Sequence, residues 1–112
     1  MNDPTAYKIL TADQWAALNA GVFTGAPIDE ADGFVHLSTA IQLAGTLDLH
    51  FAGQNDLVIA AIDLTEFGDA VRWEPSRQGE LFPHLYAPLT RSAVIGWCPV
   101  KRSLTGAVRL PT

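Results

Sequence analysis

The sequence predicts an α+β fold, a single compact domain over residues 1–112 in which two N-terminal helices pack on a mostly antiparallel β-sheet. Two observations predict this arrangement. The helical patterns lie in the first half of the chain, and the apolar runs after them are short and separated by turn residues. In addition, 48% of the residues are hydrophobic and no repeat, low-complexity tract or linker divides them, so we expect one core.

The composition limits the partners and the compartment. The 12 acidic and 7 basic residues give a formal charge of −5, and the basic residues form no cluster. We therefore expect no nucleic-acid partner and no binding to an anionic membrane surface. The N-terminus lacks the pattern of a signal peptide, and no apolar run is long enough to span a membrane. The one cysteine, Cys98, is expected to be a buried, unreactive thiol in a cytoplasmic protein.

The chain begins with a strand and a capped helix. Tyr7–Leu10 alternates weakly between apolar and polar residues, as a first strand would. Thr11 and Gln14 have the spacing of a capping box, which predicts that a helix begins after Thr11. Gly21 suits the left-handed residue that ends such a helix. Residues 21–32 show no sustained periodicity, and we expect them to form a loop that borders a pocket.

A short strand then runs directly into a second helix. Gly33–Leu37 is apolar except for one histidine, which indicates a buried strand. Ser38 or Thr39 is the expected N-cap, and Thr39 with Gln42 repeats the capping-box spacing. His50 falls in the last turn, where we expect it at the surface beside the negative end of the helix dipole. The expected apolar face of this helix is formed by Ile41, Ala44, Leu47 and Phe51.

The next two runs predict strands. Leu57–Ile62 is a continuous apolar run bounded by polar residues, which is typical of a central strand buried on both faces. Ala70–Glu74 predicts a further strand, with Val71 and Trp73 on one of its faces.

The last part of the chain is also strand-like. Leu81–Tyr86 contains Pro83, which argues against a central position in a sheet because proline cannot donate to the ladder. Ala93–Val100 is the last clear strand, and its Gly96 indicates a bulge. Residues 106–110 are expected to add a short final strand.

His36 is the first candidate site residue. Phe34, His36 and Ser38 share one face of the predicted strand because side chains alternate along it. Ser38 and the first amides of the following helix can bind an anion or a ribose hydroxyl next to the imidazole. The alternative is a core histidine whose nitrogens are satisfied by backbone groups.

His84 is the second candidate. It follows a proline, and Tyr86 projects on the same side if the segment is extended. The alternative is a turn whose rings pack on the core, but a second histidine flanked by apolar residues favours a pocket shared with His36. We expect no metal site, because zinc needs three or four ligands and no metal-binding motif occurs. The weaker alternative is a site made of both histidines with Asp63 or Glu80.

Polar and aromatic residues near the second candidate widen the choice of chemistry. Arg72, Trp73, Glu74 and Arg77 supply two cations, a ring for stacking and a carboxylate. The alternative is an edge strand with solvated charges around one buried tryptophan. No dinucleotide-binding glycine motif, P-loop or nucleophile elbow is present, so the corresponding cofactor and hydrolase chemistries have no support.

Four motifs together resemble the small bacterial family called domain of unknown function 952. The resemblance spans nearly the whole chain, and the family label carries no assigned activity. The motifs are Gly33–Thr39, Leu57–Asp63, Trp73-Glu74, and Phe82–Tyr86 followed by Pro88-Leu89.

Val35–Ser38 is also similar to a strand motif of the ADP-ribosyltransferase superfamily, and most similar to its RNA 2′-phosphotransferase branch. This similarity implies a curved or split sheet and a site for NAD. The residues implied in binding NAD are His36, Ser38, Thr39, Trp73 and Tyr86, and those implied in catalysis are His36, His84 and Glu74, with Glu80 as the alternative carboxylate.

The chemistry implied by this similarity is glycosidic cleavage of NAD through an oxocarbenium-like state. His36 and Ser38 would hold the ribose, an aromatic ring would stack on nicotinamide, and a carboxylate would stabilise the developing positive charge. The net charge argues against an RNA acceptor. Two alternatives stay open: a non-catalytic module that binds a small anionic or nucleotide ligand, and a structural domain with core histidines.

Overall fold

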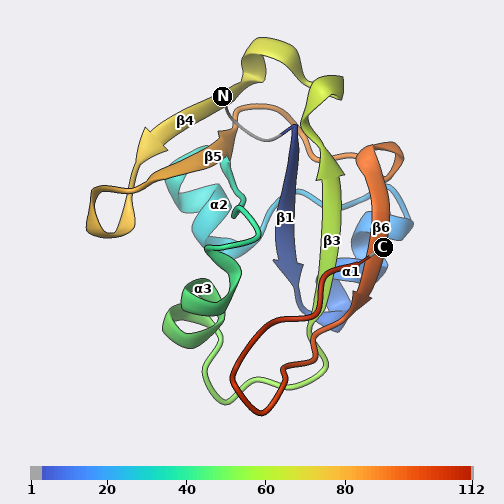
Figure 1. Ribbon diagram of the computed structural model, residues 1–112. Coiled ribbons are helices and arrows are strands. Elements are labelled where there is room, and N and C mark those ends of the chain that lie inside the picture. Colours follow the sequence, from blue (N-terminus) through green and yellow to red (C-terminus); the bar gives the residue numbers. More distant parts are fainter. Residues whose placement is uncertain (1–3, 112) are drawn as a thin grey trace.

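Two three-stranded antiparallel sheets form the framework of the protein in the computed structural model, which describes residues 4–111 (Figure 1). The strands are β1 (Thr5–Leu10), β2 (Val35–His36), β3 (Val58–Asp63), β4 (Val71–Pro75), β5 (Leu81–Leu85) and β6 (Val94–Pro99). Their order is β1-β3-β6 in one sheet and β2-β5-β4 in the other. The predicted α+β class and the antiparallel pairing are confirmed, and β3 is the central, buried strand of its sheet.

Three α-helices accompany the sheets in the described part of the chain, where the sequence predicted two. They are α1 (Ala12–Asn19), α2 (Pro27–Asp32) and α3 (Leu43–His50). The capping box that begins α1 is confirmed: Thr11 Oγ1 accepts from the amide of Gln14 at 3.2 Å, and Gln14 Oε1 accepts from the amide of Thr11 at 2.9 Å. Gly21 follows this helix with a left-handed φ of 76°, as expected.

The prediction of a loop over residues 21–32 was wrong for its second half, which forms α2. Pro27 occupies the first turn, and the carboxylate of Asp29 accepts a hydrogen bond from the amide of Ala26 at 2.8 Å. Gly33 ends the helix at φ 83°. A helix of 6 residues is too short to show a helical period, so its signals are only these end residues.

The expected apolar face of α3 was partly wrong. Thr39 and Gln42 exchange the two predicted capping bonds, at 3.0 and 3.3 Å, but the α-helix itself begins only at Leu43. Ile41 is therefore in the preceding turn, out of phase with the helix, and its side chain is 93% exposed. Leu47 is buried and Phe51 packs on the same core, as predicted, and Leu43 takes the place expected for Ile41.

One backbone bridge joins the two sheets. The amide of Tyr7 in β1 donates to the carbonyl of Ser38 at 2.8 Å, and the amide of Ser38 donates to the carbonyl of Tyr7 at 2.9 Å. The chain just after β2 therefore lies against β1, and this contact brings the His36 to Ser38 segment beside the first sheet.

β5 is the central strand of its sheet, although Pro83 argued against that position. The Pro83 carbonyl accepts from the amide of Leu37 at 3.2 Å, just beyond the end of β2. Because the nitrogen and carbonyl of one strand residue face the same side, the missing N–H of Pro83 also falls where β2 has ended. The sheet therefore loses little from this proline.

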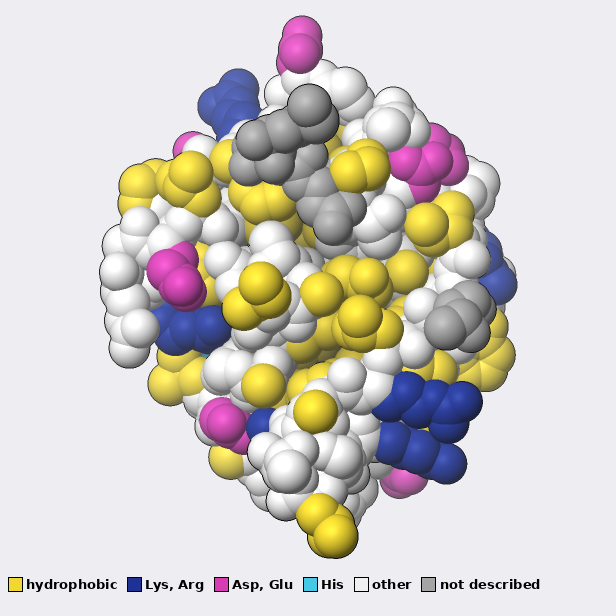
Figure 2. All heavy atoms as spheres, in the orientation of Figure 1, with side chains coloured by type: hydrophobic (Ala, Val, Ile, Leu, Met, Phe, Trp, Pro, Cys, Tyr) yellow, Lys and Arg dark blue, Asp and Glu magenta, His cyan; other side chains and the backbone are white. Residues whose placement is uncertain are grey.

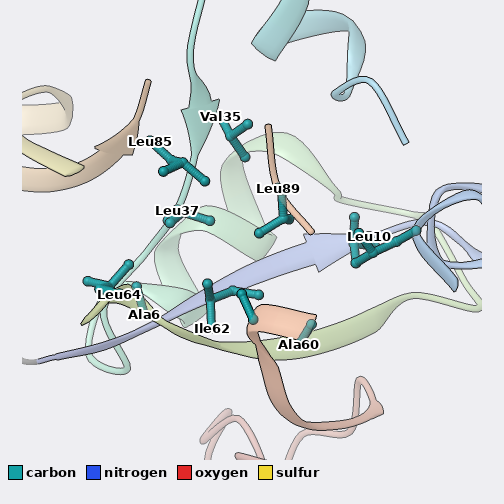
Figure 3. Packing of buried hydrophobic residues seen from close by; sticks show 11 residues of the cluster. Ala6, Leu10, Val35, Leu37, Ala60, Ile62, Leu64, Leu85 and Leu89 are labelled. Carbon is teal, nitrogen blue, oxygen red and sulfur yellow. The ribbon is translucent and has the colours of Figure 1, made fainter. Parts of the chain in front are cut away.

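The main core lies between the two sheets (Figure 3). Val35 and Leu85 point from β2 and β5 towards Ile62 of β3, and Leu10 of β1 closes one side (Figure 3). Trp73 and Val71 pack against this cluster from β4, so their predicted shared face is confirmed. A second, smaller core on the other face of the first sheet contains Ile9, Leu43, Leu47, Leu57 and Ile59.

The C-terminal part differs from expectation in two respects. The pairing register of β6 shifts beside Gly96, which agrees with the predicted bulge. Residues 106–110 form no strand, only an isolated bridge between Arg102 and Val108. Cys98 is half-buried rather than buried, because β6 is an edge strand of its sheet. In the part of the chain that the structure describes, no helix has the length and apolarity needed to cross a membrane.

Replacement of Leu10 by alanine is expected to lower the free energy of unfolding by about 2–5 kcal/mol, because it removes apolar contacts and leaves a cavity in the main core. The matched control is Leu104→Ala, at a fully exposed side chain, which is expected to change stability by less than about 0.5 kcal/mol. Urea denaturation measures both, and equal losses would contradict the placement of Leu10.

Candidate functional site

A cavity of about 430 Å³ lies between β1, α3 and the β2–β5 region, and all three histidines of the chain line it. These are His36 of β2, His50 of α3 and His84 of β5. Apolar side chains form much of the remaining wall, and Figure 2 shows hydrophobic side chains gathered in a hollow beside β1. None of the residues that line the cavity, within the described range 4–111, is Asp or Glu.

His36 is held from behind by α2. Its Nδ1 lies 2.7 Å from Asp29 Oδ1, and its backbone amide donates to the same oxygen at 2.9 Å. Its Nε2 lies 2.9 Å from Asp32 Oδ2. Gly33 makes this arrangement possible, because its left-handed conformation turns the chain from α2 directly into β2. Both ring nitrogens of His36 are therefore engaged by carboxylates, and both donate when the ring is protonated.

Asp29 is buried and pairs with a buried lysine. Lys8 Nζ lies 3.1 and 2.9 Å from the two carboxylate oxygens of Asp29 and also donates to the carbonyl of His36 at 3.0 Å. Burial alone would raise the pKa of Asp29, but hydrogen bonds and charge from His36 and Lys8 outweigh it and lower the pKa to about 2. Burial lowers the pKa of Lys8 below its usual 10.5, against the opposing effect of Asp29.

His84 has a different environment. Its side chain is buried, and its Nδ1 lies 2.9 Å from Glu74 Oε1. Glu74 also accepts from the hydroxyl of Tyr86 at 2.6 Å, and these two bonds, that from Tyr86 first, hold the pKa of Glu74 below its usual value. Nε2 of His84 makes no hydrogen bond within residues 4–111. In the neutral tautomer in which Nδ1–H donates to Glu74, Nε2 is left as an acceptor without a partner in residues 4–111.

Phe34 links the two imidazoles. Its ring stacks on His84 with centroids 4.1 Å apart and packs on His36 at 4.5 Å. The two imidazoles meet edge to face, with centroids 5.6 Å apart. Tyr86 packs on the same phenylalanine at 5.1 Å. His36 and His84 also lie opposite each other in the pairing of β2 with β5, so the strand register and the ring of Phe34 together fix their spacing.

A profile of the family described as "Protein of unknown function (DUF952)" matches residues 9–97 of the chain. The chain belongs to the DUF952 family. It is similar over 95% of its length to protein CC0527 from Caulobacter crescentus, with 40% identity, a TM-score of 0.83 and 94% of that chain covered in the X-ray structure. The solution NMR structure of CC0527 gives a TM-score of 0.78 at 39% identity and covers 91% of that chain. No curated protein matches.

The structure brings together only some of the predicted site residues of this DUF952 protein. His36, Ser38 and His84 line the cavity together. Glu74 and Tyr86 lie behind His84 and do not line the cavity.

Two other predicted residues lie outside the site. Thr39 caps the turn before α3 through its hydroxyl, which accepts from the amide of Gln42. Trp73 points to the main core, because it alternates with Glu74 along β4. Within the described residues, no group of three or more His, Cys, Asp or Glu side chains is arranged to hold a metal ion.

Sequence reasoning missed Asp29 and Lys8. Lys8 lies between Ala6 and Leu10 on the core face of β1, and an ammonium group at such a position needs a buried partner. This signal was present in the sequence, but it did not identify the partner, which is 21 residues away. Arg77 was noted only as a nearby cation, although it lines the cavity.

The ion pair gives a pH-dependent prediction. The folded-state pKa of Asp29, about 2, lies below the ordinary 3.8, so its contribution to stability is present above about pH 4 and is lost as the pH falls towards 2. The shift corresponds to about 2 kcal/mol. Between pH 5 and pH 2, the free energy of unfolding of the wild type should therefore fall by about 2 kcal/mol more than that of Asp29→Asn. Urea denaturation at the two pH values measures this difference.

At pH 7, Asp29→Asn is expected to cost about 3–5 kcal/mol because it leaves Lys8 buried without a counter-charge. Asp32→Asn on the same helix is the matched control, and its exposed carboxylate is expected to contribute less than about 1 kcal/mol. Parallel pH profiles for wild type and Asp29→Asn would contradict the proposed role of the pair.

Proposed function

We propose that the cavity binds NAD or a related phosphate-bearing nucleotide. The observation that carries this proposal is the placement of two imidazoles, His36 and His84, with Ser38 in one cavity that no acidic residue lines within the described range. A nucleotide needs donors for its phosphates, partners for its ribose hydroxyls and apolar walls for its rings, and this lining supplies each of them.

The charge of the lining supports an anionic ligand. The chain has a net charge of −5, yet its cavity is lined by Arg77, Lys8 and the three histidines with no carboxylate facing them from the wall. The carboxylates that pair with His36 and His84 do not line the cavity. Lys8, His36 and His84 use their donors on carboxylates and a carbonyl, so the donors left for a small anion are chiefly those of Arg77, which bonds only to neutral oxygens.

The rings of the cavity suit a flat heteroaromatic group. Tyr7, Phe51 and Phe82 line it, so they take the stacking role that Trp73 and Tyr86 would otherwise have. His84 Nε2 is free to accept a hydrogen bond from a ribose or acceptor hydroxyl.

ADP-ribosyl transfer is the second candidate, favoured by the pairing of His84 with Glu74. In this reaction the bond between nicotinamide and the ribose carbon breaks, nicotinamide leaves with the bonding electrons, and an acceptor oxygen forms the new bond. His84 Nε2 would take the acceptor proton, while Glu74 holds the ring and balances its charge. Because Glu74 does not line the cavity and contacts it through His84, this candidate would use an imidazole rather than a carboxylate at the reacting position.

The test is an NMR titration of labelled protein with NAD, ADP-ribose and nicotinamide. We expect saturable shifts at His36, His84 and the amides of residues 33–39. His84→Asn keeps a donor for Glu74 but removes the nitrogen at the Nε2 position, and should weaken NAD binding at least about tenfold. His84→Gln keeps a polar atom near the Nε2 position and should weaken binding less.

A dispersed spectrum for both variants shows that the fold is intact. An absence of shifts at millimolar NAD and ADP-ribose would overturn the proposal, and equal binding by wild type and His84→Asn would remove His84 from the site. Nicotinamide release from bound NAD separates transfer from binding alone.

A further inference from the structure

Arg77 occupies an unusual position for an arginine in an acidic protein. It lines the cavity, is half-buried, and forms no ion pair with any carboxylate in residues 4–111. We propose that Arg77, which Thr46 orients and the Ser38 hydroxyl adjoins, forms the subsite that binds a phosphate group of the ligand. This inference rests on the proposed nucleotide function and identifies where the anionic part of the ligand lies.

The guanidinium of Arg77 is held in place but is not saturated. Nη1 donates to Thr46 Oγ1 at 3.3 Å and Nη2 to the carbonyl of Gln42 at 3.4 Å, both long bonds, and the group lies 4.9 Å above the ring of Phe82. A guanidinium has five N–H donors, so most of its donors stay available within the described structure. Stacking on a ring and bonding to neutral oxygens orient the group without neutralising it.

Gly45 provides the space for this arrangement. A Cβ atom at position 45 would lie 3.0 Å from Nη2 of Arg77 and 3.4 Å from its Cζ, closer than such atoms normally approach. Gly45 lies inside α3, where glycine is unfavourable relative to alanine by about 1 kcal/mol. Gly45 therefore weakens α3 slightly but leaves room for the guanidinium of Arg77 to lie against the helix.

The two hydroxyls lie beside the guanidinium. Thr46 Oγ1 donates to the carbonyl of Gln42 at 3.1 Å and accepts from Arg77, and Ser38 Oγ lies 3.1 Å from Thr46 Oγ1. Ser38 is 5% exposed and lines the cavity with Thr46. His50 follows Thr46 by one helical turn and lines the cavity as well. The Thr46 proton is used on the Gln42 carbonyl, whereas the Ser38 hydroxyl can turn its proton towards a ligand. An anion at this place would therefore meet a guanidinium, the Ser38 hydroxyl and an imidazole from three different segments.

Two acidic side chains share a groove with Arg77 but form no ion pair with it. Asp48 and Glu80 lie along a neighbouring groove on the other side of Arg77 rather than along the cavity. Asp48 is bound by Arg102 at 2.6 Å. Arg77 is therefore the cation of the cavity wall whose charge is not paired, whereas the charge of Lys8 is matched by Asp29. A phosphate oxygen is the ligand group that its planar array of donors recognises best.

The test compares adenosine, AMP, ADP-ribose and inorganic phosphate as probes, titrated into wild type and variants and followed by NMR. Arg77→Gln should weaken the binding of AMP and of ADP-ribose at least about tenfold and leave the binding of adenosine unchanged. Gly45→Ala should weaken the binding of the same two probes, because the new methyl group displaces the guanidinium. Its unfolding temperature should equal or exceed that of the wild type. Arg109→Gln, at an exposed arginine whose side chain makes no hydrogen bond or ion pair with residues 4–111, is the control for loss of one charge.

The outcomes separate this inference from the proposed function. The subsite is supported if Arg77→Gln and Gly45→Ala bind the phosphate-bearing probes more weakly than the wild type, while Arg109→Gln binds them as the wild type does. If ADP-ribose binds wild type and both variants equally, the subsite is overturned and the nucleotide proposal stands. If inorganic phosphate binds through Arg77 while NAD, ADP-ribose and AMP do not bind, the subsite stands and the nucleotide proposal fails. If no probe binds wild type, both are overturned.

Discussion

The buried carboxylate of Asp29 is the group on which the arrangement of the site depends. It connects three segments, because its oxygens accept from Lys8 of β1, from the amide before α2 and from the amide and ring of His36 in β2. Removal of a carboxylate and an ammonium group from water costs several kcal/mol for each ion, which is offset only while all these donors are in place. A helix as short as α2 is not stable by itself, and this network fixes it against the sheets.

A fixed His36 in turn determines the position of the second imidazole. Phe34 precedes His36 by two residues on the same strand face, and its ring stacks on His84 of the neighbouring strand. His84 is held at its other edge by Glu74, which is itself held by Tyr86. The site therefore consists of two carboxylate–imidazole pairs joined through one phenylalanine. A change that moves α2 would be transmitted to His84 through this packing and through the pairing of β2 with β5, in which His36 lies opposite His84.

Much of the framework followed from sequence, because capping and alternation are local properties. The capping boxes at Thr11 and Thr39, the buried run of β3 and the shared face of Val71 and Trp73 each depend on a few neighbouring residues. The site was less predictable, because its partners are distant in sequence. Asp29 looked like an ordinary loop acid, and only the fold shows that it lies beside Lys8 and His36. Trp73 was assigned to the site because of the resemblance, but the alternation of side chains along β4 directs it to the core. At this position the alternation was the better guide.

The placement of charge explains how an acidic protein can form a cavity whose lining, within residues 4–111, includes no Asp or Glu. Asp29 and Glu74 satisfy the imidazoles of His36 and His84 without lining the cavity. The imidazoles are therefore oriented by carboxylates that lie behind them rather than in the cavity wall. The net charge of −5 acts over a longer range and repels extended polyanions, whereas a small anion inside the cavity interacts mainly with the nearby donors. This separation of short-range and long-range charge favours a small phosphate-bearing molecule over a nucleic acid as the ligand of the proposed site.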